Sequence, residues 1–216
     1  SMTNAPYLLP KARAGMRIGH DRVMDHMMLD GLEDAYEPGR SMGTFGEDCA
    51  AKYSFTREQQ DAFATASVQR AQAAIASGGF AAEITPVTVK TRAGEVQISM
   101  DEGPGKIKLD KIPTLRSAFK KDGTITAASS SSINDGAAAM VMMRASTAAD
   151  MGLQPLARLV AHAVQAQEPN WFATAPVGAV NKALAKAGWT AEDVDLWEVN
   201  EAFAVVAMAM MPALNL

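Results

Sequence analysis

The sequence predicts an α/β protein with a layered core, and three patterns in its 216 residues carry this prediction. In the last third of the chain, stretches of strand length alternate with helical stretches, the order that is typical of helices packed on a sheet. Hydrophobic residues make up 48% of the sequence but aromatic residues only 6%, which favours closely packed helices with small side chains. Residues 1–122 lack this regular alternation, so we expect them to form a separate, looser unit.

The strongest single element in that unit is a helix that begins after Thr56. Thr56 and Gln59 have the spacing of a capping box, in which each residue bonds the backbone of the other. Apolar residues then recur at helical spacing until Gly78 and Gly79 interrupt the pattern. We therefore expect one long helix between these two signals.

Shorter elements flank this helix. Residues 1–40 predict an extended excursion followed by a helix, and residues 40–53 a short helix with a glycine-containing entry. Downstream, residues 84–90 and 96–100 have the composition of two strands joined by a turn. Residues 101–122 are expected to be an irregular surface loop.

The remaining chain is expected to build the layered part. Three strands are predicted, over residues 124–128, 157–164 and 194–199. A helical stretch follows each strand: one rich in Ala, Met and Val after Gly136, one opened by Thr174 and Pro176 and closed by Gly188, and one directly after Asn200.

Charge and composition exclude several classes of protein. Twenty Lys and Arg residues against 24 Asp and Glu residues give a net charge of -4, which argues against a general nucleic-acid binder. Every apolar run falls short of the roughly 20 residues that a membrane span requires, and the N-terminus lacks the pattern of a signal peptide. We therefore expect a soluble cytoplasmic protein.

The single Cys has no Cys or His cluster around it, so no metal site is expected.

Two polar positions follow predicted strands. The serine run 129–132 would let a ligand approach the backbone closely, with exposed N–H groups at the start of a helix; alternatively it caps that helix together with Asn134 and Asp135. Asn200 stands where a strand meets a helix, the edge at which open α/β sheets place ligands; alternatively it is a simple N-cap.

The thiol and imidazole groups give weaker signals. Cys49 has acidic neighbours, which raise the pKa of a thiol, so we expect a small core residue and not a nucleophile. The three histidines, His20, His26 and His162, have no carboxylate or Cys partner at a telling spacing. We expect them to be structural or exposed.

Five segments together resemble the thiolases, the family of acetyl-CoA C-acetyltransferases and 3-ketoacyl-CoA thiolases. They are SMTNAPYLLPKAR at 1–13, SMGTFGEDCAAKYSFTREQQDAFA at 41–64, RSAFKKDGTITAASSSSINDGAAAMVM at 116–142, APVGAVNKALAKAGW at 175–189 and DVDLWEVNEAF at 193–203. They run in family order over nearly the whole chain.

The resemblance implies a thiolase-like layered αβαβα core with an inserted α+β loop domain, incomplete in this chain. Residues 1–122 would be the loop domain. Residues 123–148 would be the last strand and helix of the N-terminal half of the core, and 149–216 the first part of its C-terminal half.

It also implies an acyltransferase that joins or cleaves acyl-CoA through a Cys acyl-enzyme, with a second Cys as base and two oxyanion holes. In the family the nucleophilic Cys precedes the segment that opens here, and the His and second Cys follow the helix that closes it. We therefore expect the central portion of a longer enzyme, inactive alone. The alternative is a non-catalytic thiolase-like protein that binds acyl-CoA or a lipid.

Site residues are carried over by position. Asn200 is similar to the family's Asn that holds a water in the first oxyanion hole. The resemblance implies substrate-binding roles for Leu32, Met42, Phe119, Ala127, Ser131, Ile133, Ala202 and Phe203.

Two positions depart from the family. Ser41 stands where many members have His, and 103–108 lacks the usual acidic, proline and arginine pattern, leaving Lys106 as a candidate for the CoA phosphates. The acyl-CoA is a substrate, so no cofactor is expected. A homo-oligomer, dimer or tetramer, is expected through the region of residues 8–28, in a protein of fatty acid metabolism.

Overall fold

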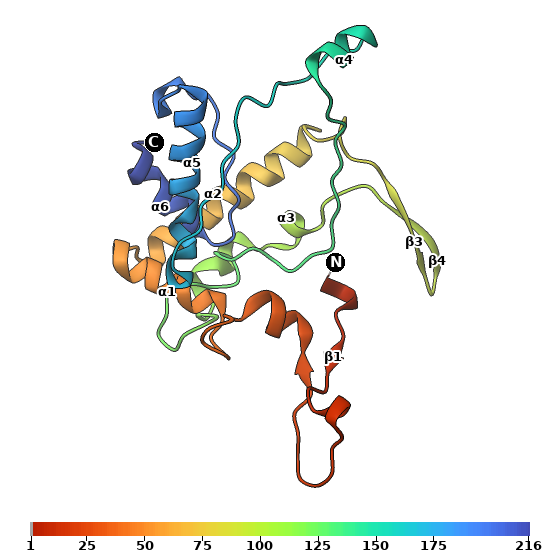
Figure 1. Cartoon of the computed structure of the whole chain (residues 1–216), viewed down its shortest axis with the longest axis vertical. Coiled ribbons are helices and arrows are strands. Elements are labelled where there is room, and N and C mark those ends of the chain that lie inside the picture. The colour runs from red at the N-terminus through yellow and green to blue at the C-terminus, as the bar shows by residue number, and fades with distance from the viewer. Residues whose placement is uncertain (1) are drawn as a thin grey trace. The chain divides into compact units, whose positions relative to one another are not determined.

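The computed structural model describes residues 2–216 (Figure 1). These residues divide into two compact units. The first unit comprises the residues up to Phe45, residues 133–199 and residues 208–216. The second unit comprises residues 46–132 and 200–207. Helix α1 (Met42–Tyr53) and helix α6 (Ala204–Leu214) each run from one unit into the other.

The long helix predicted after Thr56 is confirmed as α2 (Arg57–Ala76) in the second unit. Its capping box forms as expected: the Gln59 amide N–H donates to Thr56 Oγ1 at 3.2 Å, and the Thr56 N–H donates to the Gln59 side chain at 2.9 Å. The helix ends before Gly78, whose φ of +71° lies in the left-handed region that favours glycine.

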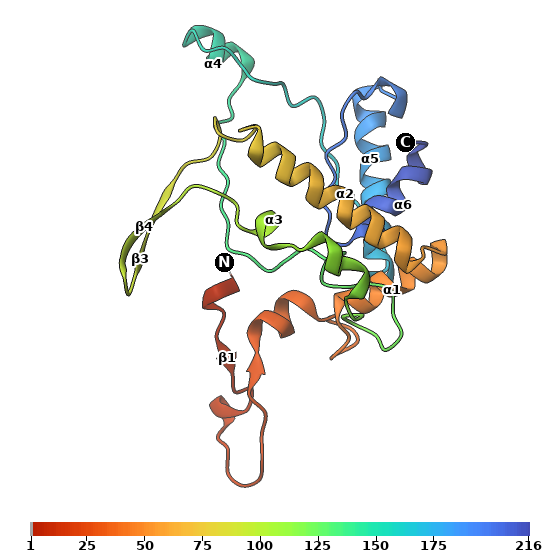
Figure 2. The ribbon, with the colours of Figure 1, turned by 180° about the vertical axis from the view of Figure 1, so that it is seen from behind.

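The two predicted strands after this helix are confirmed as an antiparallel hairpin. Strand β3 (Val87–Thr91) pairs with β4 (Gly94–Ile98), and Val89 faces Val96. Both strands are exposed along their whole length, and Figure 2 shows the hairpin extending away from α2. The expected irregular loop that follows contains two short helices, α3 (Gly103–Lys106) and the 3-10 helix η4 (Leu109–Thr114).

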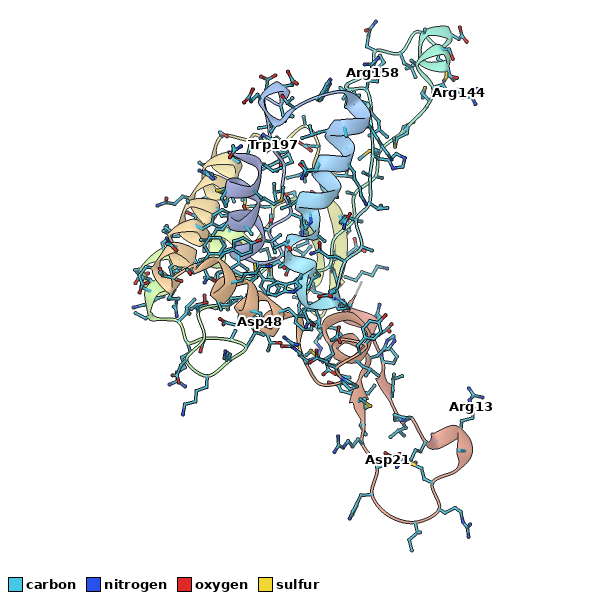
Figure 3. The ribbon with its side chains drawn as sticks, turned by 60° about the vertical axis from the view of Figure 1, so that its left-hand side comes forward. Arg13, Asp21, Asp48, Arg144, Arg158 and Trp197 are labelled. Atoms are coloured by element: carbon cyan, nitrogen blue, oxygen red, sulfur yellow. The ribbon has the colours of Figure 1, made fainter. Side chains whose placement is uncertain are left out.

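The first unit opens with the predicted excursion. The 3-10 helix η1 (Met2–Asn4) precedes a short antiparallel pair, β1 (Tyr7–Leu8) and β2 (Met24–Asp25). Between them the chain makes a long exposed loop that includes η2 (Ala12–Ala14); Figure 3 labels Arg13 and Asp21 on it. The helix expected to follow is a single π-helical turn, η3 (Met28–Leu32).

Helices make up the remaining elements of the first unit. They are α4 (Ala145–Asp150), the 3-10 helix η5 (Pro169–Thr174), α5 (Ala175–Ala187) and the 3-10 helix η6 (Ala191–Asp193). The predicted end of α5 is confirmed, because Gly188 takes a left-handed φ of +72° and its N–H bonds back to the last turn. No helix within residues 2–216 is both long enough and apolar enough to span a membrane.

Three predicted strands are wrong. Residues 124–128, 157–164 and 194–199 form no strand in the described part of the chain. A strand exists only when a neighbouring strand accepts and donates its backbone hydrogen bonds, and none of these segments has such a neighbour here. At 124–125 the backbone amides bond the Glu47 side chain instead.

The helix expected after Gly136 is also wrong, because helical structure in this region is confined to α4. The apolar side chains of this stretch are not buried: Val141 is 88% exposed and Met140 81%. Helices in proteins gain most of their stability from the packing of an apolar face, which this stretch does not obtain.

The core of the second unit lies where α1 meets the segment around Ile125. Ile125 is fully buried, and a Cβ added to Gly46 on α1 would lie 2.6 Å from its Cδ1 atom. Only glycine allows the helix to approach so closely. This contact brings α1 against the stretch that carries several predicted site residues.

Candidate functional site

Two distant stretches of the second unit, residues 118–131 and 200–204, are joined by backbone hydrogen bonds. The Ser131 N–H donates to the Ala202 carbonyl and the Ala204 N–H to the Ser129 carbonyl, both at 2.9 Å. Ser130 and Phe203 form an isolated antiparallel bridge between them. The serine run is therefore fixed to the start of α6.

An aromatic contact joins the same two stretches. The rings of Phe119 and Phe203 meet edge to face, with centroids 5.8 Å apart and planes at 90°. This geometry suits the charge distribution of aromatic rings. Phe119, Ser131, Ala202 and Phe203, four residues predicted to bind substrate, thus come together in one unit. Their contact with a substrate stays a prediction.

Within the serine run the hydroxyls differ in their partners. Ser129 Oγ accepts a hydrogen bond from the Thr126 N–H at 2.9 Å, and Ser130 Oγ donates to the Thr126 carbonyl at 2.8 Å. The Ser131 side chain is exposed and bonds no group within residues 2–216. Because no helix begins after the run, the predicted helix cap and the predicted N–H groups at a helix start are both wrong.

Asn200 is exposed and ends an extended stretch, four residues before α6 begins. That spacing rules out the alternative that it is the N-cap of this helix. Its neighbour Glu201 accepts a hydrogen bond of 2.6 Å from Ser67 Oγ on α2, which fixes this part of the chain to the helix. The role of Asn200 in an oxyanion hole stays a prediction.

The other predicted substrate-binding residues are placed differently. Ala127 is exposed in the second unit. Leu32, Met42 and Ile133 belong to the first unit, where Leu32 is half-buried at the end of η3 and Ile133 is 56% exposed. Their substrate contacts likewise stay predictions.

Cys49 is the core residue that the sequence predicts. It lies beside Asp48 on α1 (Figure 3) and is fully buried, with a free thiol. Burial raises the pKa of Cys49 to about 11, and Lys52 opposes this shift. The predicted rise of the thiol pKa is confirmed, but its cause is desolvation and not the acidic neighbours.

The histidine predictions need one correction. His26 pairs with Asp30, with 3.4 Å between Nε2 and Oδ2 at a spacing of four residues, a partner that the sequence analysis missed. His20 and His162 are exposed, as expected.

Lys106, the candidate for the CoA phosphates, is paired with Glu102 one helical turn before it. No group of His, Cys, Asp and Glu within residues 2–216 has the arrangement of a metal site.

A cavity of about 410 Å³ in the second unit was not predicted. It lies between the end of α2, the turn after it and the loop after β4, and contains none of the predicted site residues. Its walls are formed by Ala71, Ile75, Gly78, Phe80, Ala81, Glu83, Ile84, Ser99, Met100, Asp101 and Pro104.

Glu47 is a further residue that the sequence analysis missed. It lies on α1, only 6% exposed, and its carboxylate accepts hydrogen bonds from the Thr124 and Ile125 N–H groups at 2.9 Å. In the sequence it is an ordinary acid on a predicted helix, so only its burial distinguishes it.

Comparisons with known proteins match the whole chain. The family model described as "Thiolase, N-terminal domain" matches residues 1–146, and "Thiolase, C-terminal domain" matches residues 153–216. A probable acetyl-CoA acetyltransferase of Dictyostelium discoideum is 46% identical over all of this chain and 52% of its own length. Acetyl-CoA acetyltransferase 1 of Arabidopsis thaliana is 48% identical, also over all of this chain and 52% of its own length.

The crystal structure of the Bacillus anthracis acetyl-CoA acetyltransferase has a TM-score of 0.94 at 40% sequence identity. It is covered over 55% of its length by all of this chain. The predicted thiolase-like fold is therefore confirmed, and the chain spans about half the length of the curated relatives it matches. The family models, the relatives and the fold agree, and the chain belongs to the thiolase family.

Proposed function

We propose that this chain forms part of an acyl-CoA C-acyltransferase of the thiolase type, which joins or cleaves acyl-CoA thioesters. Support comes from the family and from the relatives, whose names state acetyl-CoA acetyltransferase activity. The chain matches about half of each relative, so the proposal concerns the whole enzyme to which such a chain contributes.

One observation carries the proposal: the loop 118–131 is hydrogen-bonded to the start of α6, and the rings of Phe119 and Phe203 pack edge to face between them. In our proposal these rings form an apolar wall for the pantetheine arm of CoA. The exposed hydroxyl of Ser131 offers a hydrogen-bonding group to the amides of that arm. Ala127 and Ala202, with small side chains, leave room for it.

Asn200, in the same unit, would hold a water that donates a hydrogen bond to the thioester oxygen, which becomes negatively charged as the carbonyl is attacked. For Leu32, Met42 and Ile133, which belong to the first unit, we propose apolar contacts with the acyl group or the pantetheine.

The thiolate that carries the acyl group is not Cys49. That thiol is fully buried, its pKa is raised to about 11 by burial, and it is the only Cys of the sequence. The relatives continue beyond the stretch that this chain matches, and we place the thiolate there. Its attack on the thioester forms the acyl-enzyme and releases CoA as the leaving group.

The contact between the loop 118–131 and residues 202–204 also favours a second candidate function, a non-catalytic protein that binds acyl-CoA or a lipid. The groups of this site serve binding, and Cys49, which is buried and has a raised pKa, supplies no nucleophilic thiolate.

Its cellular setting is part of the proposal: a cytoplasmic protein of fatty acid metabolism, acting as a homodimer or homotetramer. The loop between β1 and β2 supports the oligomer, because Ile18 is 100% exposed and Val23 63%. Exposed apolar side chains of this kind are common in subunit contacts.

We also propose the division into a loop domain (1–122) and two parts of the core (123–148 and 149–216).

Two assays separate the candidate functions. The protein is mixed with a 3-ketoacyl-CoA and CoA, and cleavage to two acyl-CoA products is followed; binding of CoA is measured by calorimetry. Cleavage supports the acyltransferase, and binding without cleavage, even when the part of a relative that this chain does not match is added, supports the non-catalytic binder. Absence of both contradicts the proposal.

A further inference from the structure

We propose that Glu47 is a positioning residue that fixes the loop 118–131 in the conformation that binds acyl-CoA. The inference rests on the function proposed above, because three predicted substrate contacts, Phe119, Ala127 and Ser131, lie on this loop. Glu47 itself is not among the predicted substrate contacts, so its effect on binding would act through the loop.

The carboxylate of Glu47 binds the loop with both oxygens. Oε1 accepts from the N–H groups of Thr124 and Ile125 at 2.9 Å; Oε2 accepts from the Thr124 N–H at 2.9 Å and from Thr124 Oγ1 at 3.0 Å. No cation is paired with Glu47 in the described part of the chain, so backbone amides and one hydroxyl satisfy its charge. Hydrogen bonds to an ionised group are stronger than neutral ones, and a buried charge makes them hard to give up.

Two neighbours show how closely this contact is built. A Cβ added to Gly123 would lie 2.3 Å from Glu47 Oε1, so the carboxylate reaches the backbone only because residue 123 is glycine. On the other side, the fully buried Gln60 of α2 donates to Thr124 Oγ1 at 2.8 Å. Thr124 is therefore held by two helices, α1 and α2.

Glu47 binds the loop next to a hydrogen bond that closes the turn between residues 118 and 125. The Ala118 N–H donates to the Ile125 carbonyl at 2.9 Å, and between them the chain turns at Gly123, whose N–H bonds the Lys120 carbonyl at 3.0 Å. Phe119 directly follows residue 118, and Ala127 lies two residues after Ile125. Release of residues 124 and 125 would free both at once.

The test replaces Glu47 by Gln, which keeps the side chain's size but turns one accepting oxygen into an NH₂ donor that faces backbone N–H groups. In the whole acyltransferase, we expect the KM for acyl-CoA to rise about tenfold and kcat to change less than about twofold, because the loop holds the non-reacting part of the substrate. Hydrogen exchange at the amides of Thr124 and Ile125 should become about tenfold faster.

A matched control and a milder variant accompany it. Glu58→Gln removes an exposed carboxylate on α2 that bonds no residue of the loop, and it should leave KM and both exchange rates unchanged. Thr124→Val removes only the hydroxyl bonded by Glu47 and Gln60 and keeps both backbone amides. Because it should fold even if Glu47→Gln does not, its KM, expected to rise about threefold, provides an independent test.

The outcomes separate this inference from the proposed function. A wild-type KM in Thr124→Val, or in a folded Glu47→Gln protein whose exchange at residues 124 and 125 is faster, would overturn the positioning role and leave the acyltransferase proposal intact. A fall in kcat that matches the fall in kcat/KM would also overturn it, because the effect would then lie in the transition state. Failure of the wild-type protein to bind CoA would defeat both.

Discussion

Ile125 and Leu159 are aliphatic residues in segments that the sequence predicts as strands, yet they have opposite environments. Ile125 is fully buried against α1, with its N–H bonded to Glu47. Leu159 is 64% exposed in an irregular stretch without a strand partner. An apolar pattern thus indicates which residues favour burial, but whether they are buried depends on partners elsewhere in the chain.

The largest effect is expected when this comparison is tested directly. Ile125→Ala should lower the free energy of unfolding of this chain by about 2–5 kcal/mol, because it removes buried methyl groups and leaves a cavity. Leu159→Ala removes a comparable side chain from solvent and should change the free energy by less than about 0.5 kcal/mol. Urea unfolding measures both, and equal losses would show that the two regions do not differ.

Asn200 sharpens the comparison, because in the sequence it follows the unpaired residues 194–199 and precedes the hydrogen-bonded residues 202–204. In the active acyltransferase, Asn200→Ala should lower kcat about 100-fold, as loss of a group in an oxyanion hole does. Steady-state kinetics with acyl-CoA measure it. Unchanged turnover would reject the role of this amide.

Cys49 lies on α1, the helix against which Ile125 is buried, and its reactivity tests whether water is excluded there. Its pKa of about 11, against 9.0 for an exposed thiol, predicts about 100-fold less thiolate at pH 8 and a matching fall in the rate of alkylation by iodoacetamide. The same cysteine in urea serves as the control. Alkylation of the native protein at the unfolded rate would contradict the burial.

The pKa of Cys49 also sets the sign of a pH dependence. Between pH 9 and 11 the unfolded thiol loses its proton while the folded thiol keeps it, so the stability that this group contributes is present below pH 9 and lost as pH rises toward 11. Cys49→Ser, whose hydroxyl does not ionise in this range, should lack this part of the decline in alkaline urea titrations.

The smallest effect is expected at the start of α2, where local sequence alone determines the structure. Thr56→Ala removes one half of the capping box and should cost about 1 kcal/mol of stability. Gln59→Ala removes the reciprocal bond and should cost less. Thermal unfolding compares the two variants. A loss of unfolding free energy larger than that of Ile125→Ala would show that local capping stabilises the chain more than core packing does.

Local signals and distant contacts differ in how far the sequence reveals them. The start of α2 and the end of α5 could be predicted because a capping box and a left-handed glycine act within a few residues. The strands at 124–128, 157–164 and 194–199 could not, because pairing depends on groups far away in the sequence. At residue 124 the partner is the side chain of Glu47, 77 positions away, which no periodicity reveals.

The candidate site shows a similar limit. The resemblance to thiolases selected Phe119, Ser131, Ala202 and Phe203, which the structure brings together. It did not select Glu47, because a buried acid that bonds backbone amides has the same one-letter code as a solvated one. The His26 and Asp30 pair was visible as a spacing of four residues but was not recognised.

The central claim is that the loop 118–131, bonded to residues 202–204, binds acyl-CoA. The most direct test is an NMR titration of the isotopically labelled protein with CoA, in which the amide shifts of the backbone report the binding site. We predict that the perturbed amides belong to Phe119, Ala127, Ser131, Ala202 and Phe203. Perturbations confined to the cavity lined by Ile75, Phe80 and Met100, with the loop unaffected, would contradict the account.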